Sequence, residues 1–155
     1  MVDHRAGAAS NTDVVTRMFQ DRTGHSATFS IIASQVPHLY GAGAEVPFLG
    51  TGYLVSGRAT EALTPLTSDG VGSFVAERGT ERWLVMYAYG ERRGLLGNGV
   101  RGWSMAAIDG LLGQQNDYYK LYLAARWDDQ DRNTAVALGE VAQELFTRVA
   151  DWYAA

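Results

Sequence analysis

The sequence predicts an α+β fold, in which a single, mostly antiparallel sheet of about five to six strands is packed by helices. Short apolar segments of alternating polarity, separated by glycine and proline, fill the middle of the chain, as is typical of antiparallel strands. Segments near 104–113 and at 134–153 instead repeat apolar residues at helical spacing. With 155 residues, 46% hydrophobic and 19% charged, the chain can bury one core.

The chain begins with small and polar residues, so we predict a tail at 1–10 followed by a single α+β domain at 11–155. The first ten residues of that domain carry apolar side chains at helical spacing, which predicts a short N-terminal helix. These side chains are Val14, Val15, Met18 and Phe19.

The segments that follow are rich in β-branched and aromatic residues and are bounded by turn residues. Residues 26–36 form the first predicted strand, and a glycine-containing loop covers 38–47. Residues 48–56 form a second strand and 71–77 a third, which turns at 78–81 into the central strand. The predicted sheet is therefore built largely from consecutive hairpins.

The central strand, 82–89, is apolar on both faces, so we expect helices or a partner subunit to cover each side. After a loop, Ser104 can cap a helix that Gly113 ends. Residues 117–127 fit both a strand and a helix, and their aromatic content favours a strand. The segment 134–153 predicts a long amphipathic C-terminal helix that docks on the sheet.

The loop over residues 90–102 is the first candidate site, because glycines let backbone N–H groups converge beside arginines and a helix N-terminus. The predicted ligand is a small anion, and the alternative is a turn whose arginines are solvated. The candidate ligand-binding residues are Arg92, Arg93, Gly94, Gly97, Gly99 and Arg101.

The strand, Arg/Gly-rich loop and helix over residues 83–127 resemble the segment with which GNAT-superfamily acyltransferases hold a pyrophosphate. The resemblance implies an acyl or nucleotide carrier as ligand. The chain departs from that family in ending with a long helix where the family has further strands, and in having strands before the loop where the family has two helices. The glycine order is also neither that of a P-loop nor that of a dinucleotide-binding fold.

A second candidate is an acidic segment before the C-terminal helix. Four of its residues have the 1, 3, 5 and 12 spacing of a calcium-binding loop, namely Asp129, Asp131, Asn133 and Glu140. Thr134 stands where that loop needs glycine for its sharp turn. The alternative is an acidic cap at the N-terminus of the helix.

Composition excludes several classes of function. The absence of cysteine excludes disulfides, thiolate nucleophiles and cysteine-ligated metals, and the net charge of −4 argues against nucleic acid or an anionic membrane as partner. No segment is apolar for long enough to span a bilayer or to serve as a secretory signal, so a soluble, cytoplasmic protein is expected. All basic residues except Lys120 are arginine, which suggests a high-GC genome, bacterial or phage.

No catalytic residue is identified, and no cofactor is expected. The three histidines, His4, His25 and His38, lack the spacing of a metal site, and no nucleophile is paired with a base in any familiar motif. We therefore expect a noncatalytic protein-binding or assembly module that self-associates or belongs to a larger complex. The alternative is a small-molecule enzyme or ligand-binding domain, acyltransferase-like, that uses loop 91–102 for an anionic ligand.

Overall fold

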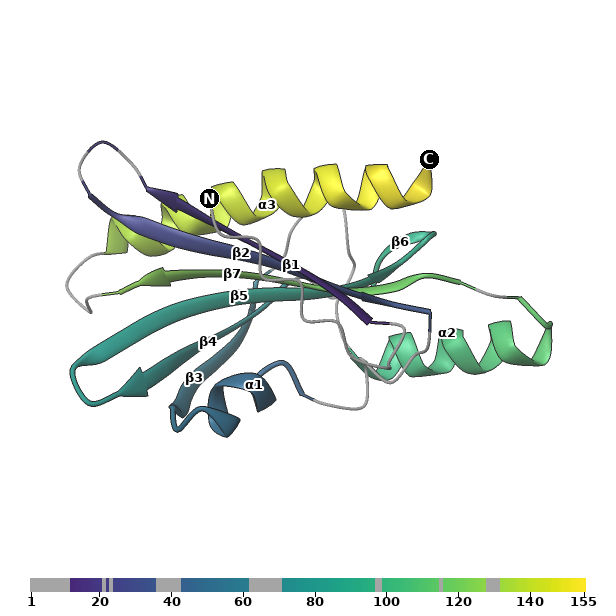
Figure 1. Ribbon diagram of the computed structural model, residues 1–155, viewed down its shortest axis with the longest axis horizontal. Coiled ribbons are helices and arrows are strands. Elements are labelled where there is room, and N and C mark those ends of the chain that lie inside the picture. Colours follow the sequence, from purple (N-terminus) through teal and green to yellow (C-terminus); the bar gives the residue numbers. More distant parts are fainter. Residues whose placement is uncertain are drawn as a thin grey trace.

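The structure, a computed structural model, contains one antiparallel sheet with helices on both faces (Figure 1). It describes residues 12–20, 22, 24–35, 43–61, 71–96, 99–114, 116–127 and 132–155. The elements in order are β1 (Thr12–Gln20), β2 (Ser26–Ser34), α1 (Val46–Gly50), β3 (Leu54–Glu61), β4 (Val71–Arg78), β5 (Glu81–Glu91), β6 (Gly94–Leu95), α2 (Gly99–Leu111), β7 (Tyr118–Arg126) and α3 (Arg132–Ala154). The α+β class predicted from the sequence is confirmed.

The sheet has seven strands in the order β1-β2-β7-β5-β4-β3, with the short β6 paired to β5. The segment from β3 to β5 is a meander of neighbouring strands, whereas β7 lies between β2 and β5. The last strand of the chain therefore joins the N-terminal hairpin to the meander.

The prediction of an N-terminal helix is wrong, because residues 12–20 form strand β1. Val14 and Val15 are β-branched and fit a strand at least as well as a helix. All nine residues of β1 pair with β2 without interruption, whereas a nine-residue helix without a partner would be only marginally stable in water. The helical spacing of the apolar side chains could not reveal this distant partner.

Two other boundaries also differ from the prediction. Residues 46–50 form helix α1 where the sequence predicted a loop and the start of a strand, because proline is well tolerated in the first turn of a helix. β3 consequently begins at Leu54. Helix α2 begins at Gly99, so Ser104 lies within it and is not its cap.

The remaining elements agree with the sequence. Strands β2, β4 and β5 lie where alternation predicted them, and the β4–β5 hairpin turns at Gly79, whose φ of 61° favours glycine. Residues 118–126 form a strand, which resolves the ambiguity of that segment. The long C-terminal helix is α3, and Gly113, with a φ of 66°, follows the end of α2.

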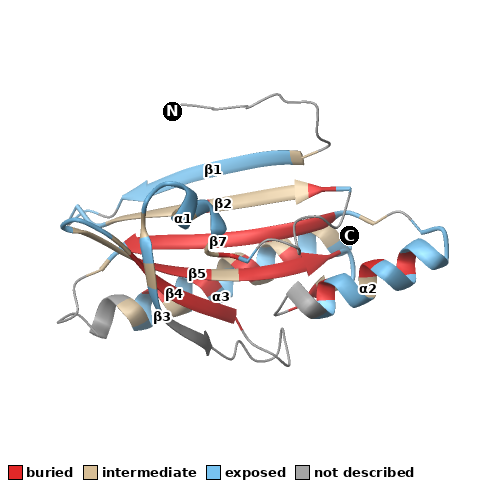
Figure 2. Ribbon diagram, turned by 90° about the horizontal axis from the view of Figure 1, so that it is seen from below, coloured by how far each residue is buried: buried red, intermediate tan, exposed pale blue. Residues whose placement is uncertain are grey.

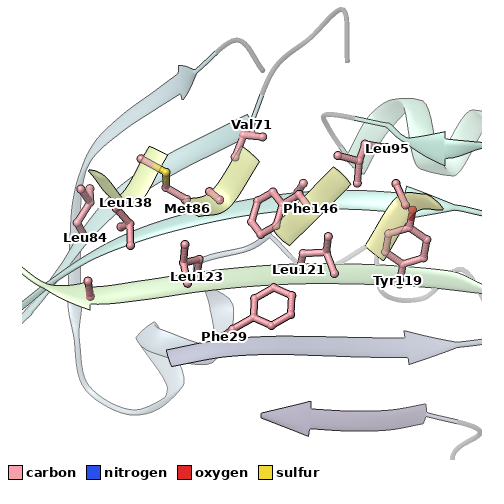
Figure 3. Packing of buried hydrophobic residues seen from close by; sticks show 14 of the residues in the cluster. Phe29, Val71, Leu84, Met86, Leu95, Tyr119, Leu121, Leu123, Leu138 and Phe146 are labelled. Carbon is pink, nitrogen blue, oxygen red and sulfur yellow. The ribbon is translucent and has the colours of Figure 1, made fainter. Parts of the chain in front are cut away.

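Helix α3 covers one face of the sheet and forms the larger core (Figures 1 and 3). It presents a buried side chain every four residues: Leu138, Ala142, Phe146 and Ala150. Phe146 packs between the helix and the strands, with its ring 6.3 Å from that of Phe29 on β2. The central strands β5 and β7 contribute most of the apolar side chains below α3.

The opposite face carries an aromatic cluster partly covered by α1 and α2. Phe48 of α1 packs edge-to-face on Phe74 of β4, with ring centroids 5.3 Å apart. The Tyr122 hydroxyl donates a hydrogen bond of 3.0 Å to the carbonyl of Ala44. Both faces of the central strand thus contribute to a core within one chain, which is one of the two alternatives that its sequence allowed.

Burial is uneven across the sheet (Figure 2). The central strands β7, β5 and β4 are mostly buried, β2 is half-buried, and β1 is exposed along nearly all its length. Among the described residues, no helix combines the length and hydropathy required to cross a bilayer.

Candidate functional site

The structure divides the predicted anion-binding loop into three parts. Arg92 and Arg93 form a two-residue turn between β5 and β6, and Gly94 follows with a φ of 125° that only glycine adopts readily. Gly99 and Arg101 belong to the first turn of α2, and Gly97 lies outside the described residues. The proposed ligand site therefore stays a prediction, with its arginines distributed between a turn and a helix.

Arg93 is already bound to two buried carboxylates. Its Nε donates to Glu91 Oε1 at 2.5 Å, and its Nη2 donates to Asp109 Oδ2 at 2.8 Å. Glu91 and Asp109 are only 1% and 0% exposed. The hydrogen bond to Glu91, above all, raises the pKa of Arg93, despite the opposing effect of burial. One guanidinium therefore faces two carboxylates, and this cluster disfavours a further anion.

A fourth side chain completes this acidic cluster, which we define as Glu91, Arg93, Asp109 and Asn116. The Asn116 amide donates to Asp109 Oδ2 at 2.6 Å. Sequence reasoning selected only Arg93, although one signal was present: Asp109 is the single acidic residue of helix α2. The cluster fastens α2 to the end of β5.

Arg92 and Arg101 are the two arginines of the predicted set that lie outside this cluster, and both are exposed. His25 is exposed just before β2, whereas His4 and His38 lie outside the described residues. Of the arginines predicted to bind an anion, Arg93 is the one that the structure places against the buried carboxylates of Glu91 and Asp109.

The calcium-binding hypothesis conflicts with the path of the backbone. Asp129 and Asp131 lie outside the described residues, while Asn133 and Glu140 both belong to the continuous helix α3. Seven residues of helix separate these two positions by about 10 Å along the axis, whereas a calcium loop needs an irregular backbone there. In the described part of the chain, no three acidic or histidine side chains are grouped as metal ligands.

Sequence reasoning also missed the buried lysine of β7. Lys120 is 4% exposed, and its Nζ lies 4.9 Å from the ring centroid of Tyr89 and 6.0 Å from that of Tyr122. Desolvation lowers the pKa of Lys120 to about 8, although the charge of Glu45 opposes this. Burial likewise raises the pKa of Tyr89 to about 12. The signal in the sequence was a lone lysine within an aromatic strand.

This lysine makes stability depend on pH in a defined direction. With a pKa near 8 when folded and 10.5 otherwise, the unfolded chain binds more protons between these values. The stability of the wild type, measured relative to Lys120→Met, should rise by about 2–3 kcal/mol between pH 8 and 10.5. Urea denaturation of both proteins across this range measures the difference. If the free energies of unfolding of the two proteins changed equally with pH, Lys120 would have its ordinary pKa in the folded protein.

Helix α2 exposes an apolar surface to solvent. Four large side chains lie within about half of its circumference and are between 46% and 88% exposed. We call them the α2 face: Trp103, Ile108 and Leu111 of the helix, and Leu112, which directly follows it. Apart from the buried Asp109, the only charged residue of this helix is Arg101. Arg101 lies on the same side of the helix and is exposed, so this face is largely apolar but carries one charge.

A second apolar surface lies at the edge of the sheet. Strand β1 exposes side chains that alternate between the two faces, with Met18 the most exposed at 77%. We call this the β1 edge: Val14, Val15, Met18 and Phe19. Within the described residues, β1 pairs with β2 alone.

Comparisons of the chain with models of known families, with curated proteins and with solved structures find no match.

Proposed function

We propose that the protein is a noncatalytic protein-binding module that associates with further copies of itself, and that it acts in the cytoplasm. The observation that carries the proposal is the α2 face, where four large apolar side chains are exposed on one short helix. Contiguous exposed apolar side chains are costly in a monomer and are typical of surfaces that another chain covers.

The attachment of α2 supports the same interpretation. Its sheet-facing side includes Gly102, Ala106 and Asp109, and Met105 packs beside Ala106 against the aromatic cluster. The acidic cluster adds hydrogen bonds between α2 and the end of β5. The four residues of the α2 face remain exposed, so packing within the chain accounts for only part of the apolar composition of α2.

The acyltransferase-like alternative has less support. An anion-binding loop needs arginines whose charge is available, and Arg93 donates hydrogen bonds to both Glu91 and Asp109. The resemblance to the acyltransferase segment also depends on a continuous glycine-rich loop, whereas this region contains a tight turn, β6 and the start of α2.

The proposal predicts that acidic residues on the α2 face weaken self-association. For Leu111→Glu combined with Leu112→Glu, we expect the dissociation constant to rise at least ~10-fold, because each apolar side chain lost from an interface costs about 1 kcal/mol or more. Light scattering and sedimentation over a range of concentrations would measure this.

Leu54→Glu is the matched control, because Leu54 is equally exposed but lies on β3. This variant should associate as the wild type does. A wild type that remains monomeric at every concentration would contradict the proposal of self-association.

A further inference from the structure

Strand β1 lacks the backbone irregularities that normally prevent an edge strand from pairing with another chain. It is nine residues long, contains no proline or lysine, and pairs with β2 in an unbroken register. The opposite edge, β3, has a register shift between Ser56 and Ala59. Bulges, prolines and charged side chains are the usual protection of edge strands. Of the two edges, only β3 has an irregular backbone, whereas the protection of β1 is limited to the charges of Asp13 and Arg17.

Both faces of β1 leave apolar side chains exposed in the single chain. Val15 and Phe19 lie on the side of α3, because their β2 partners Ile31 and Ala27 belong to the α3 core. Val14 and Met18 lie on the other face. An added strand would cover parts of both sets, which a ligand bound to one face could not do.

Two charged residues make β1 complementary to itself. Asp13 and Arg17 flank Val15 on the α3 side of the strand, and both are exposed. When two copies of one strand pair antiparallel about a two-fold axis, the residue numbers of any two residues that face each other add up to the same value. If that value is 30, Asp13 of each strand faces Arg17 of the other strand, and Val15 faces Val15 of the second copy. In the two neighbouring registers, with sums of 32 and 28, Arg17 would face Val15 or lie beyond the end of the other strand, so the opposite charges would no longer face each other.

We propose that β1 pairs antiparallel with β1 of a second copy, with Val15 on the two-fold axis, so that the two sheets become continuous. The charge pattern indicates that the pairing partner is a second copy of β1, because Asp13 of each strand would face Arg17 of the other. This inference rests on the proposed self-association and adds a second contact between copies, separate from the α2 face.

Charge reversal tests the register. Asp13→Arg and Arg17→Asp each replace two attractive pairs with two repulsive pairs, so each should raise the dissociation constant at least ~10-fold. The double variant restores opposite charges in both pairs and should return to within about threefold of the wild type. A double variant as weak as the single variants would overturn the register. Thermal denaturation of each variant checks that its fold is retained.

Cysteine cross-linking gives an independent test, because the native chain has no cysteine. Directly opposed residues of an antiparallel pair have Cβ atoms about 4.5–5.5 Å apart, close enough for a disulfide after small adjustment. Under mild oxidation Val15→Cys should form a covalent dimer. Val14→Cys is the matched control, since its own copy would lie about 8 Å away on the diagonal, and it should not cross-link.

The outcomes separate this inference from the proposed function. If the wild type associates and Leu111→Glu/Leu112→Glu disrupts it, but Val15→Cys does not cross-link, self-association holds and the β1 pairing is wrong. If Val14→Cys cross-links as readily as Val15→Cys, the register is wrong. A wild type that is monomeric and binds only a different protein would overturn both.

Discussion

Replacing Arg93 with alanine is expected to lower the free energy of unfolding by about 3 kcal/mol, although the Arg93 side chain is half-exposed. The substitution leaves the carboxylates of Glu91 and Asp109 buried without their counter-charge. An uncompensated buried charge costs more than an exposed ion pair contributes, and here two like charges remain. Urea denaturation with a constant m-value would measure the change.

Two companion variants identify the cause. Arg93→Lys keeps the charge but loses the paired N–H donors, so its loss should be smaller than that of alanine. Adding Asp109→Asn to Arg93→Ala removes one of the two charges while preserving the shape, and should restore part of the stability. If all three variants were equally stable, the cluster would contribute shape and not charge.

The substitution Gly90→Ala is expected to lower stability by about 2–3 kcal/mol, through crowding in the core. A Cβ on Gly90 would lie 2.3 Å from the ring of Tyr119, which packs directly over this glycine from the neighbouring strand. The ring cannot retreat easily, because Tyr153 of α3 stacks on it with a centroid distance of 4.2 Å. Thermal denaturation should show a decrease in Tm of about 4–12 °C.

Gly110→Ala provides the control with the same chemical change. Gly110 lies near the end of α2, and a Cβ there meets no atom within 4 Å. Alanine is the better helix former, so this variant should be neutral or more stable by about 0.5–1 kcal/mol. Equal losses for both variants would show that flexibility of the glycine, and not the tyrosine ring, sets the effect at position 90.

Local patterns predicted the elements whose stabilising contacts are near in sequence. The β4–β5 hairpin depends on a turn at Gly79, and α3 on a regular apolar stripe, so both could be recognised without knowledge of the rest of the fold. Residues 12–20 could not, because Val14, Val15, Met18 and Phe19 fit both spacings and β2 decided between them. The strand order could not be predicted either, since nothing near Ala27 indicates a partner at Ala125.

The charged residues show the same division. The sequence marked Arg93 by its glycine-rich surroundings, but its carboxylate partner Asp109 is 16 positions away and meets it only through the docking of α2. Lys120 was visible as the only lysine, yet its burial depends on Tyr89 and Tyr122 lying beside it in the folded sheet. Composition can identify such residues as unusual, whereas their partners come from the topology.

The position of β7 has a consequence for synthesis of the chain. The ladder between β2 and β7 joins residues 27–34 to 118–125, so the N-terminal hairpin has no neighbouring strand in the described sheet until 84 more residues after Ser34 bring the chain to Tyr118. At about 5–20 residues per second, that interval lasts roughly 4–17 s on the ribosome. The meander from β3 to β5 needs no such wait, because its strands are consecutive. The exposed hairpin of a nascent chain is therefore the segment that a chaperone, or the hairpin of a neighbouring nascent chain, would encounter first.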